Sequence, residues 1–151
     1  MEIAILGLGC FWGPEIKFSK LDGVIKTEVG YCGGNNKVTT YKEVCTGTTN
    51  HAEVVKLDFD PKIISYEKIL KYFFEIHDPT TLNSQGPDFG TQYRSEIFCL
   101  NDQQNEISDT SSFFPLIGRL PVLKKILSGT SKSYNRTELI IFIRPTIIRD
   151  P

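Results

Sequence analysis

Two residues of this chain, Cys10 and Glu53, combine a reactive side chain with a position that suits chemistry. Cys10 follows a short apolar segment that ends in glycine, and residues 11–20 have the pattern of a helix. A cysteine between a strand and a helix meets unpaired N–H groups and the positive end of the helix dipole, which stabilise a thiolate. Because the thiolate is the nucleophilic form, the position predicts covalent chemistry at Cys10.

Glu53 lies in a segment, residues 51–58, in which apolar side chains alternate with polar ones. In a strand with this pattern Glu53 shares one face with Val55 and Leu57. Burial on an apolar face raises the pKa of a carboxyl group, which lets it serve as a general acid near neutral pH. A carboxylate at the strand end that turns into water is the other interpretation, and the pattern alone leaves it open.

The cysteines and histidines of the chain fit no standard metal site, and its glycine-rich segment fits no dinucleotide site. The four cysteines stand at positions 10, 32, 45 and 99, with no Cys-x-x-Cys pair and no zinc-ligand spacing. His51 and His77 lack ligand spacing to a partner, so we expect both to be structural and no metal to be bound. Residues 7–13 (GLGCFWG) miss the dinucleotide fingerprint, since their third glycine comes one residue late.

Short strands and helices are predicted around these residues. Alternating or apolar runs predict strands at residues 2–8, 24–31, 51–58 and 95–100. Helices are predicted at residues 11–20 and 65–76, the second with Ser65 as its N-cap and an apolar stripe that packs on the sheet. Residues 78–93 are rich in Pro, Gly, Asn and Gln and predict a long loop. Residues 101–106 leave open whether the chain continues as a helix.

Composition excludes several classes of protein. A chain of 151 residues, 40% of them hydrophobic, is long enough to bury a core. The formal net charge of −1 argues against a basic face for nucleic acid. No apolar run reaches the roughly 18–20 residues of a membrane helix, and the N-terminus lacks the features of an export signal. We therefore expect a cytoplasmic protein.

Five sequence blocks over about the first hundred residues resemble the peptide-methionine (S)-S-oxide reductase family. They follow in the family's order and spacing: residues 9–15 (GCFWGPE), 30–34 (GYCGG), 40–45 (TYKEVC) with 51–55 (HAEVV), 77–80 (HDPT) and 85–95 (QGPDFGTQYRS). The resemblance implies an α+β fold, a two-layer mixed sheet with packed helices around a ferredoxin-like core. It also implies thiol-dependent reduction of methionine-(S)-sulfoxide, free or in proteins.

The resemblance assigns a role to seven residues. Cys10 is implied to attack the sulfoxide sulfur, and Glu53 to donate a proton to the sulfoxide oxygen. The other implied substrate-binding residues are Tyr41 and Tyr93, whose hydroxyls bond that oxygen, Asp88, which orients the polar groups, and Phe11 with Trp12, which receive the S-methyl group.

The implied product on Cys10 is a sulfenic acid, which a thiol must reduce. Many relatives use a cysteine in a C-terminal extension and then thioredoxin, but this chain has no cysteine after Cys99. Cys32 and Cys45 are candidate resolving residues, and direct reduction by an external thiol, thioredoxin or similar, is the alternative. We expect no bound cofactor, a monomer, and partners limited to oxidised methionine and the reductant.

The tail from about residue 113 to 151 resembles the C-terminal end of bacterial outer-membrane secretins, mainly through residues 136–150. We therefore expect a chimera of a truncated reductase-like domain, residues 1–103, and a secretin-like fragment, residues 104–151, that is not an independent domain. A lone terminal strand cannot span a bilayer, so no pore is predicted. Residues 138–143 are instead a candidate strand for pairing with an open edge of the reductase sheet, and a poorly packed tail is the alternative. The rival function is an inactive reductase with at most an interaction role at a secretion assembly.

Overall fold

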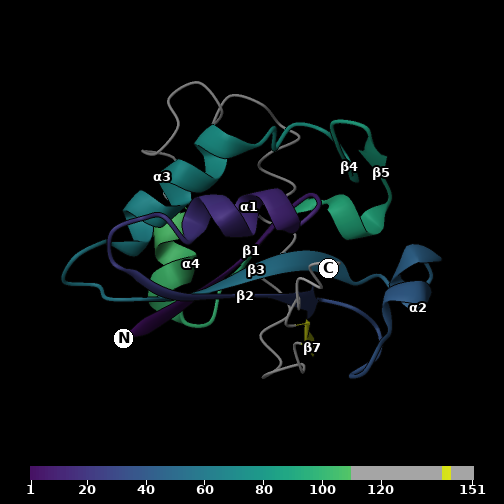
Figure 1. The fold of residues 1–151 in the computed structure, drawn as a ribbon, viewed down its shortest axis with the longest axis horizontal. Coiled ribbons are helices and arrows are strands. Elements are labelled where there is room, and N and C mark those ends of the chain that lie inside the picture. Colours follow the sequence, from purple (N-terminus) through teal and green to yellow (C-terminus); the bar gives the residue numbers. More distant parts are fainter. Residues whose placement is uncertain (110–140, 144–151) are drawn as a thin grey trace, which may run out of the picture.

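The structure is a computed structural model that describes residues 1–109 and the backbone of residues 141–143. Its elements are β1 (Glu2–Leu8), α1 (Trp12–Phe18), β2 (Val24–Cys32), α2 (Tyr41–Cys45), β3 (Ala52–Phe59), α3 (Tyr66–Ile76), β4 (Ser84–Gln85), β5 (Asp88–Phe89), the 3₁₀ helix η1 (Thr91–Tyr93), β6 (Ser95–Phe98), α4 (Asp102–Asp109) and β7 (Ile141–Ile143). Figure 1 shows α1 and α3 on the same side of the sheet, with α2 and the β4–β5 hairpin together at one end.

The main sheet has the strand order β6-β1-β3-β2-β7, which confirms an α+β fold with helices packed on a sheet. The sequence predicts a mixed sheet, but every ladder between the described strands is antiparallel. The reason lies in the order of the strands. β1 and β2 run in the same direction, but β3 lies between them and opposes both, so this parallel pair shares no ladder. The arrangement is the split βαβ unit of ferredoxin-like folds.

The main core lies between the sheet and the helices α1 and α3. Leu57 of β3, Phe18 of α1 and Phe73 of α3 belong to one cluster and are fully buried. Burial of each such side chain stabilises the fold by about 1.5–3 kcal/mol. The predicted N-cap of α3 is confirmed, because the Ser65 hydroxyl accepts a hydrogen bond from the Lys68 N–H at 3.2 Å.

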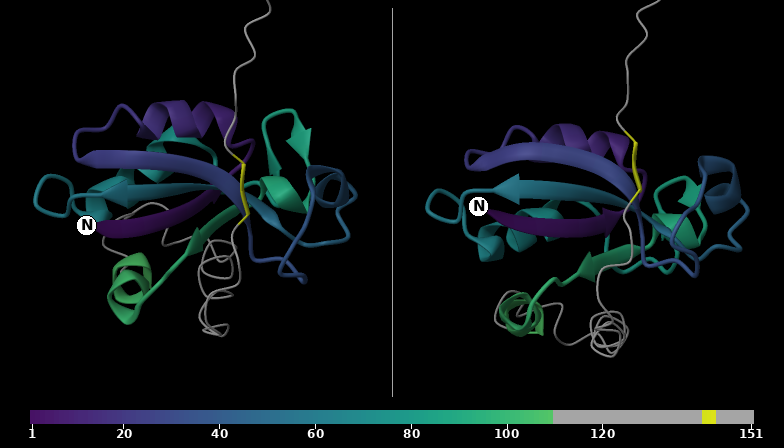
Figure 2. Two further views of the ribbon diagram at one scale, coloured as in Figure 1. Left: turned by 60° about the horizontal axis from the view of Figure 1, so that its bottom comes forward. Right: turned by 90° about the horizontal axis from the view of Figure 1, so that it is seen from below.

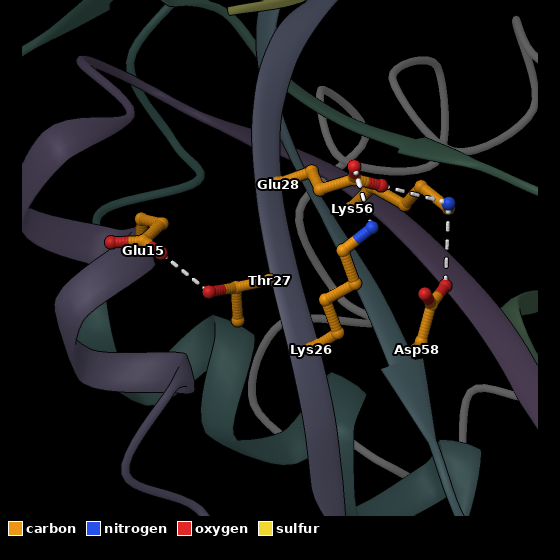
Figure 3. A network of polar contacts seen from close by, with 6 residues as sticks. All are labelled: Glu15, Lys26, Thr27, Glu28, Lys56 and Asp58. Atoms are coloured by element: carbon orange, nitrogen blue, oxygen red, sulfur yellow. Dashed lines mark hydrogen bonds and ion pairs between the residues drawn. The ribbon is translucent and has the colours of Figure 1, made fainter. Parts of the chain in front are cut away.

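The opposite face of the sheet is apolar at one end and charged at the other. A small cluster of Ile5, Ala52 and Val54 covers the first end, next to Cys32 and Phe98. At the second end Lys26, Glu28, Lys56 and Asp58 form a chain of ion pairs (Figure 3). Figure 3 also shows Thr27 on the other side of β2, where its hydroxyl donates to Glu15 of α1.

Some predicted boundaries differ from those observed. The first helix ends at Phe18, two residues early, and the chain then turns through Gly23, whose φ is +95°. The predicted loop at residues 78–93 holds the β4–β5 hairpin and η1, which are too short to leave a periodic pattern. After β6 the chain does form a helix, α4, and the Gln104 side chain donates to the Ile3 carbonyl at 2.8 Å.

The candidate pairing of the tail with the sheet is confirmed for three residues. The strand β7 lies antiparallel to β2, with Ile141 opposite Tyr31 and Ile143 opposite Val29 (Figure 2). The rest of the predicted secretin-like fragment lies outside the described residues. No helix in the described part of the chain is long and apolar enough to cross a membrane.

Candidate active site

Cys10 stands in the tight turn between β1 and α1. Gly9 has a φ of +92°, and a Cβ atom built on it would lie 2.7 Å from the Cβ and Cγ atoms of Gln85. The turn therefore requires glycine, both for its backbone angle and for the close approach of the β4–β5 hairpin. The Cys10 side chain is half-buried and is not part of a disulfide.

Glu53 lies near the start of β3, next to this turn. Its side chain is only 3% exposed, so the interpretation of Glu53 as a strand-end carboxylate turned into water is wrong. The backbone N–H of Phe11 donates to Glu53 Oε2 at 3.2 Å, which ties the start of α1 to β3. This contact brings the two residues that the sequence singles out, Cys10 and Glu53, to the same place.

The surroundings raise the pKa of both groups. Burial, together with the charge of Asp88, raises the pKa of Glu53 to about 7, against the lowering effect of the Phe11 N–H. Burial also raises the pKa of Cys10, and the carboxylates of Glu53 and Asp88 add to this. The Trp12 N–H lowers the pKa of Cys10, as expected for the start of a helix, but burial outweighs it. The predicted stabilisation of the thiolate by the start of the helix is thus present, but the net shift of the Cys10 pKa is upward because of burial.

Three further predicted residues reach the same site from separate elements. Tyr41 opens α2, whose first turn is fixed by a capping box between Thr40 and Glu43. Asp88 lies in β5 and Tyr93 closes η1. The pKa of Tyr93 is raised by burial and then by the charges of Glu53 and Asp88. These charge effects show that Asp88 and Tyr93 lie near Glu53.

Tyr41 completes this group from the solvent side. The pKa of Tyr41 is raised first by a hydrogen bond with the Cys45 side chain and then by the negative charge of the Cys45 thiolate. The charges of ionised Glu53 and Cys10 raise it further. The side chain itself is exposed. The structure thus brings together all five predicted polar residues: Cys10, Tyr41, Glu53, Asp88 and Tyr93.

The aromatic pair Phe11 and Trp12 flanks Cys10 with two different surfaces. Phe11 is buried and Trp12 is 50% exposed, and their rings meet edge to face with centroids 5.8 Å apart. Phe11 also contacts the ring of Tyr31, at a centroid distance of 5.8 Å. One ring therefore belongs to the core and the other forms an apolar surface that solvent can reach.

The two candidate resolving cysteines lie on opposite sides of the sheet. Cys32 ends β2 and packs against Ile5, Ala52 and Val54, on the face away from Glu53. Cys45 is exposed at the end of α2 and interacts with Tyr41, on the side of the site.

The two histidines make hydrogen bonds within the scaffold. Nδ1 of His77 lies 2.5 Å from the Phe73 carbonyl oxygen and Nε2 lies 2.8 Å from Ser95 Oγ, so the ring links α3 to β6. Nε2 of His51 lies 3.0 Å from the Asn36 carbonyl oxygen. Within residues 1–109 no group of three His, Cys, Asp or Glu side chains is placed to hold a metal.

Sequence reasoning gave no role to two residues of this site. Gln85 packs on Gly9, and its amide exchanges hydrogen bonds with the backbone of Asp78, at 3.2 Å and 2.9 Å. Tyr31 is 1% exposed and stands opposite Glu53 in the ladder between β2 and β3. The alternation of β2 hints at its burial, but the register that places it beside Glu53 leaves no trace in the sequence.

Comparison with known families gives two matches. Residues 2–113 match the model of a family described as peptide methionine sulfoxide reductase, and residues 102–149 match that of the secretins, bacterial type II and III secretion system proteins. The chain is 84% identical over 110 residues to peptide methionine sulfoxide reductase MsrA of Pelagibacter ubique, covering 73% of this chain and 75% of the relative. It is 57% identical over 103 residues to MsrA of Methanothermobacter thermautotrophicus, covering 68% and 61%.

Solved structures agree with this result. Methionine sulfoxide reductase A of Corynebacterium diphtheriae superposes with a TM-score of 0.68 at 40% identity, over 71% of this chain and 50% of that one. Reduced Mxr1 from Saccharomyces cerevisiae gives 0.66 at 42% identity, over 70% and 62%. Mxr1 has also been solved in complex with Trx2, where 23% identity and a TM-score of 0.52 show the fold alone. The chain thus spans between half and three quarters of the length of the two MsrA relatives and of the first two solved structures.

Proposed function

The chain belongs to the peptide methionine sulfoxide reductase family, and we propose that its described residues carry out thiol-dependent reduction of methionine-(S)-sulfoxide. The observation that carries this proposal is the buried carboxyl of Glu53, with a pKa raised to about 7, beside the half-buried thiol of Cys10. A sulfoxide oxygen leaves sulfur only after protonation, so the reaction needs an acid next to the nucleophile.

The proposed step moves one oxygen atom and one proton. The Cys10 thiolate attacks the sulfoxide sulfur and forms an S–S bond while Glu53 gives its proton to the oxygen. The protonated oxygen then passes from the substrate sulfur to the sulfur of Cys10 as the S–S bond breaks. The substrate sulfur is reduced by two electrons to the thioether, and the Cys10 thiol is oxidised to a sulfenic acid. Because burial raises the pKa of both groups, the pair holds a single proton between pH about 7 and the higher pKa of the thiol. The reactive form is the one with this proton on Glu53.

The five other predicted residues serve the substrate in this proposal. The hydroxyls of Tyr41 and Tyr93 donate to the sulfoxide oxygen, and Asp88 orients the polar groups. The S-methyl group lies against Phe11 and Trp12, which supply apolar surface beside Cys10.

Turnover in this proposal ends with reduction of the sulfenic acid by an external thiol, thioredoxin or similar; the solved complex of Mxr1 with Trx2 is consistent with such a partner. Of the two candidate resolving cysteines, Cys45 is supported by its interaction with Tyr41 on the side of the site. Cys32 packs on the opposite face of the sheet and would need to cross it. We propose no bound cofactor and a cytoplasmic monomer.

A test with both epimers decides the reaction. The purified chain is incubated with a peptide that contains racemic methionine sulfoxide and with dithiothreitol, and each epimer is followed by chromatography. Loss of the S epimer alone supports the proposal. Loss of neither epimer by folded protein contradicts it. Mass spectrometry after one equivalent of substrate, without reductant, then distinguishes a sulfenic acid on Cys10 from a Cys10–Cys45 or Cys10–Cys32 disulfide.

The division into a reductase-like domain at residues 1–103 and a secretin-like fragment at 104–151 also remains a proposal. The two family matches overlap at residues 102–113, and α4 crosses the proposed boundary while bonded to β1. The secretin match favours one second function, an inactive chain that contacts a secretion assembly. Folded protein that reduces neither epimer and binds a purified secretin is the result that this second function predicts.

A further inference from the structure

The hydroxyl of Tyr31 is a buried polar group that the proposed reaction does not use. The side chain is 1% exposed, and its hydroxyl has no hydrogen-bond partner among the described residues. An unpaired buried hydroxyl lowers the stability of the fold, whereas phenylalanine would fill nearly the same space without that cost. Such a group therefore calls for a role in a state other than the one observed.

The surroundings of Tyr31 point to that state. In the ladder between β2 and β3, Tyr31 stands directly opposite Glu53, so the two side chains lie on the same face of the sheet. The ring packs at a tilt against Phe11, whose N–H is the hydrogen-bond donor to Glu53. After burial, the charge of Glu53 is the largest effect that raises the pKa of Tyr31.

Tyr31 lies close to the acid of the site. Among the groups whose charges raise the pKa of Tyr31, Glu53 has the largest effect and Cys45 the next. The titratable groups around Glu53 are Cys10 from the first turn, Tyr31 from β2, Tyr41 and Cys45 from α2, Asp88 from β5 and Tyr93 from η1. Of the three hydroxyls in this group, only that of Tyr31 is both fully buried and in register with Glu53.

We propose that Tyr31 is a positioning residue of the site, whose hydroxyl donates a hydrogen bond to the Glu53 carboxylate once that group has given up its proton. The inference rests on the proposed function. When the proton moves from Glu53 to the sulfoxide oxygen, a negative charge appears on a buried carboxylate whose only donor among the described residues is the Phe11 N–H. The hydroxyl of Tyr31 turns toward this charge and keeps its own proton.

Replacement of Tyr31 by phenylalanine tests the proposal, because it removes only the hydroxyl. A hydrogen bond to a charged group contributes about 1.5–3 kcal/mol, which corresponds to roughly one unit or more in the pKa of the acceptor. In Tyr31→Phe the limb of the pH–rate profile near pH 7 moves up by about one unit. An unchanged limb overturns the proposal, whatever the melting temperature does.

Tyr66→Phe is the matched control. Tyr66 is also a buried tyrosine, but it lies in α3, interacts with Cys99 and has no place in the site. Its loss changes stability and leaves the limb near pH 7 in place. If both variants move the limb equally, the effect is a general loosening of the core and the proposal fails.

A second measurement needs neither substrate nor turnover. Infrared spectroscopy follows the C=O band of protonated Glu53, identified by its absence in Glu53→Gln, as the pH rises. Tyr31→Phe raises the midpoint of this titration, and 3-fluorotyrosine at position 31, a stronger donor of similar size, lowers it. Equal midpoints in all three proteins overturn the proposal. If the parent protein reduces no sulfoxide but the two variants still shift the midpoint, the proposed function is contradicted and the positioning role of Tyr31 is not.

Discussion

Glu53 and Glu28 lie on neighbouring strands of one sheet and have opposite surroundings. Glu28 accepts from Lys26 Nζ at 2.8 Å and from Lys56 Nζ at 3.0 Å on the outer face (Figure 3). The hydrogen bond from Lys26 is the largest of the effects that lower its pKa. Glu53 lies on the inner face, forms no ion pair with a described residue, and has a pKa raised to about 7.

The difference shows that burial and the sign of the nearest charge decide what a carboxyl can do. Two lysines lower the pKa of Glu28, so its carboxylate holds strands together and offers no proton near neutral pH. Glu53 is buried, and the charge of a second carboxylate, Asp88, adds to the effect of burial, so Glu53 keeps its proton up to neutral pH. Both states arise within one ladder, because the alternation of β2 and β3 separates the two faces.

The largest effect is expected at the thiol. Cys10→Ser abolishes turnover, because serine forms no comparable anion near neutral pH. Cys99→Ser is the control, since Cys99 is also half-buried with a pKa raised by burial, but lies beside α4. Activity of Cys10→Ser within tenfold of the parent would remove Cys10 from the reaction.

Replacement of each carboxyl by an amide tests whether Glu53 and Glu28 differ in function. Glu53→Gln keeps size and hydrogen bonding but loses the transferable proton, so kcat/KM falls about 10²–10⁴-fold and the limb near pH 7 disappears. Glu28→Gln leaves both unchanged. Steady-state kinetics from pH 5 to 10 provides the measurement, and equal rates for the two variants would demote Glu53 to a structural residue.

A smaller effect is expected from loss of the Asp88 carboxylate. Asp88→Asn removes the carboxylate that helps to raise the pKa of Glu53, so this pKa falls. Because loss of the Glu53 proton produces the limb near pH 7, the limb moves to lower pH, by up to about one unit. A limb that stays in place, or moves upward, would mean that Asp88 acts on the substrate and not on Glu53.

The smallest expected effect is the loss of the contribution that Glu28 makes to the stability of the fold. The pKa of Glu28 is lowered on folding, so its contribution is present above the unfolded pKa and is lost as pH falls through the folded value. Glu28→Gln therefore lowers the free energy of unfolding at pH 7 by about 0.2–1 kcal/mol, and the difference shrinks as the pH is lowered. Urea denaturation at pH 7 and at successively lower pH values measures it. A difference that persists at low pH would point to packing and not to charge.

The place of Glu53 on the inner face of the sheet could be predicted from the sequence, but the ion pairs of Glu28 on the outer face could not. Alternation in a single strand sufficed to place Glu53 on an apolar face, because the period of a strand fixes the face of every residue in it. The partners of Lys56 and the place of Tyr31 depend on the register between β2 and β3, which is set by contacts across the whole sheet. The net upward shift of the Cys10 pKa could not be predicted, because a local rule about helix starts takes no account of burial by distant residues.

The interior position of β1 in the sheet has a consequence for how the protein is made. β1 pairs with β3 on one edge and with β6 on the other, and Gln104 bonds to Ile3 across 101 residues. At about 5–20 residues per second, a ribosome needs roughly 5–20 s between β1 and its last partner. During that time one edge of an apolar strand is unpaired and the following thiol lies outside any folded site. The newborn chain is therefore most open to aggregation and oxidation at the segment that later carries the reaction.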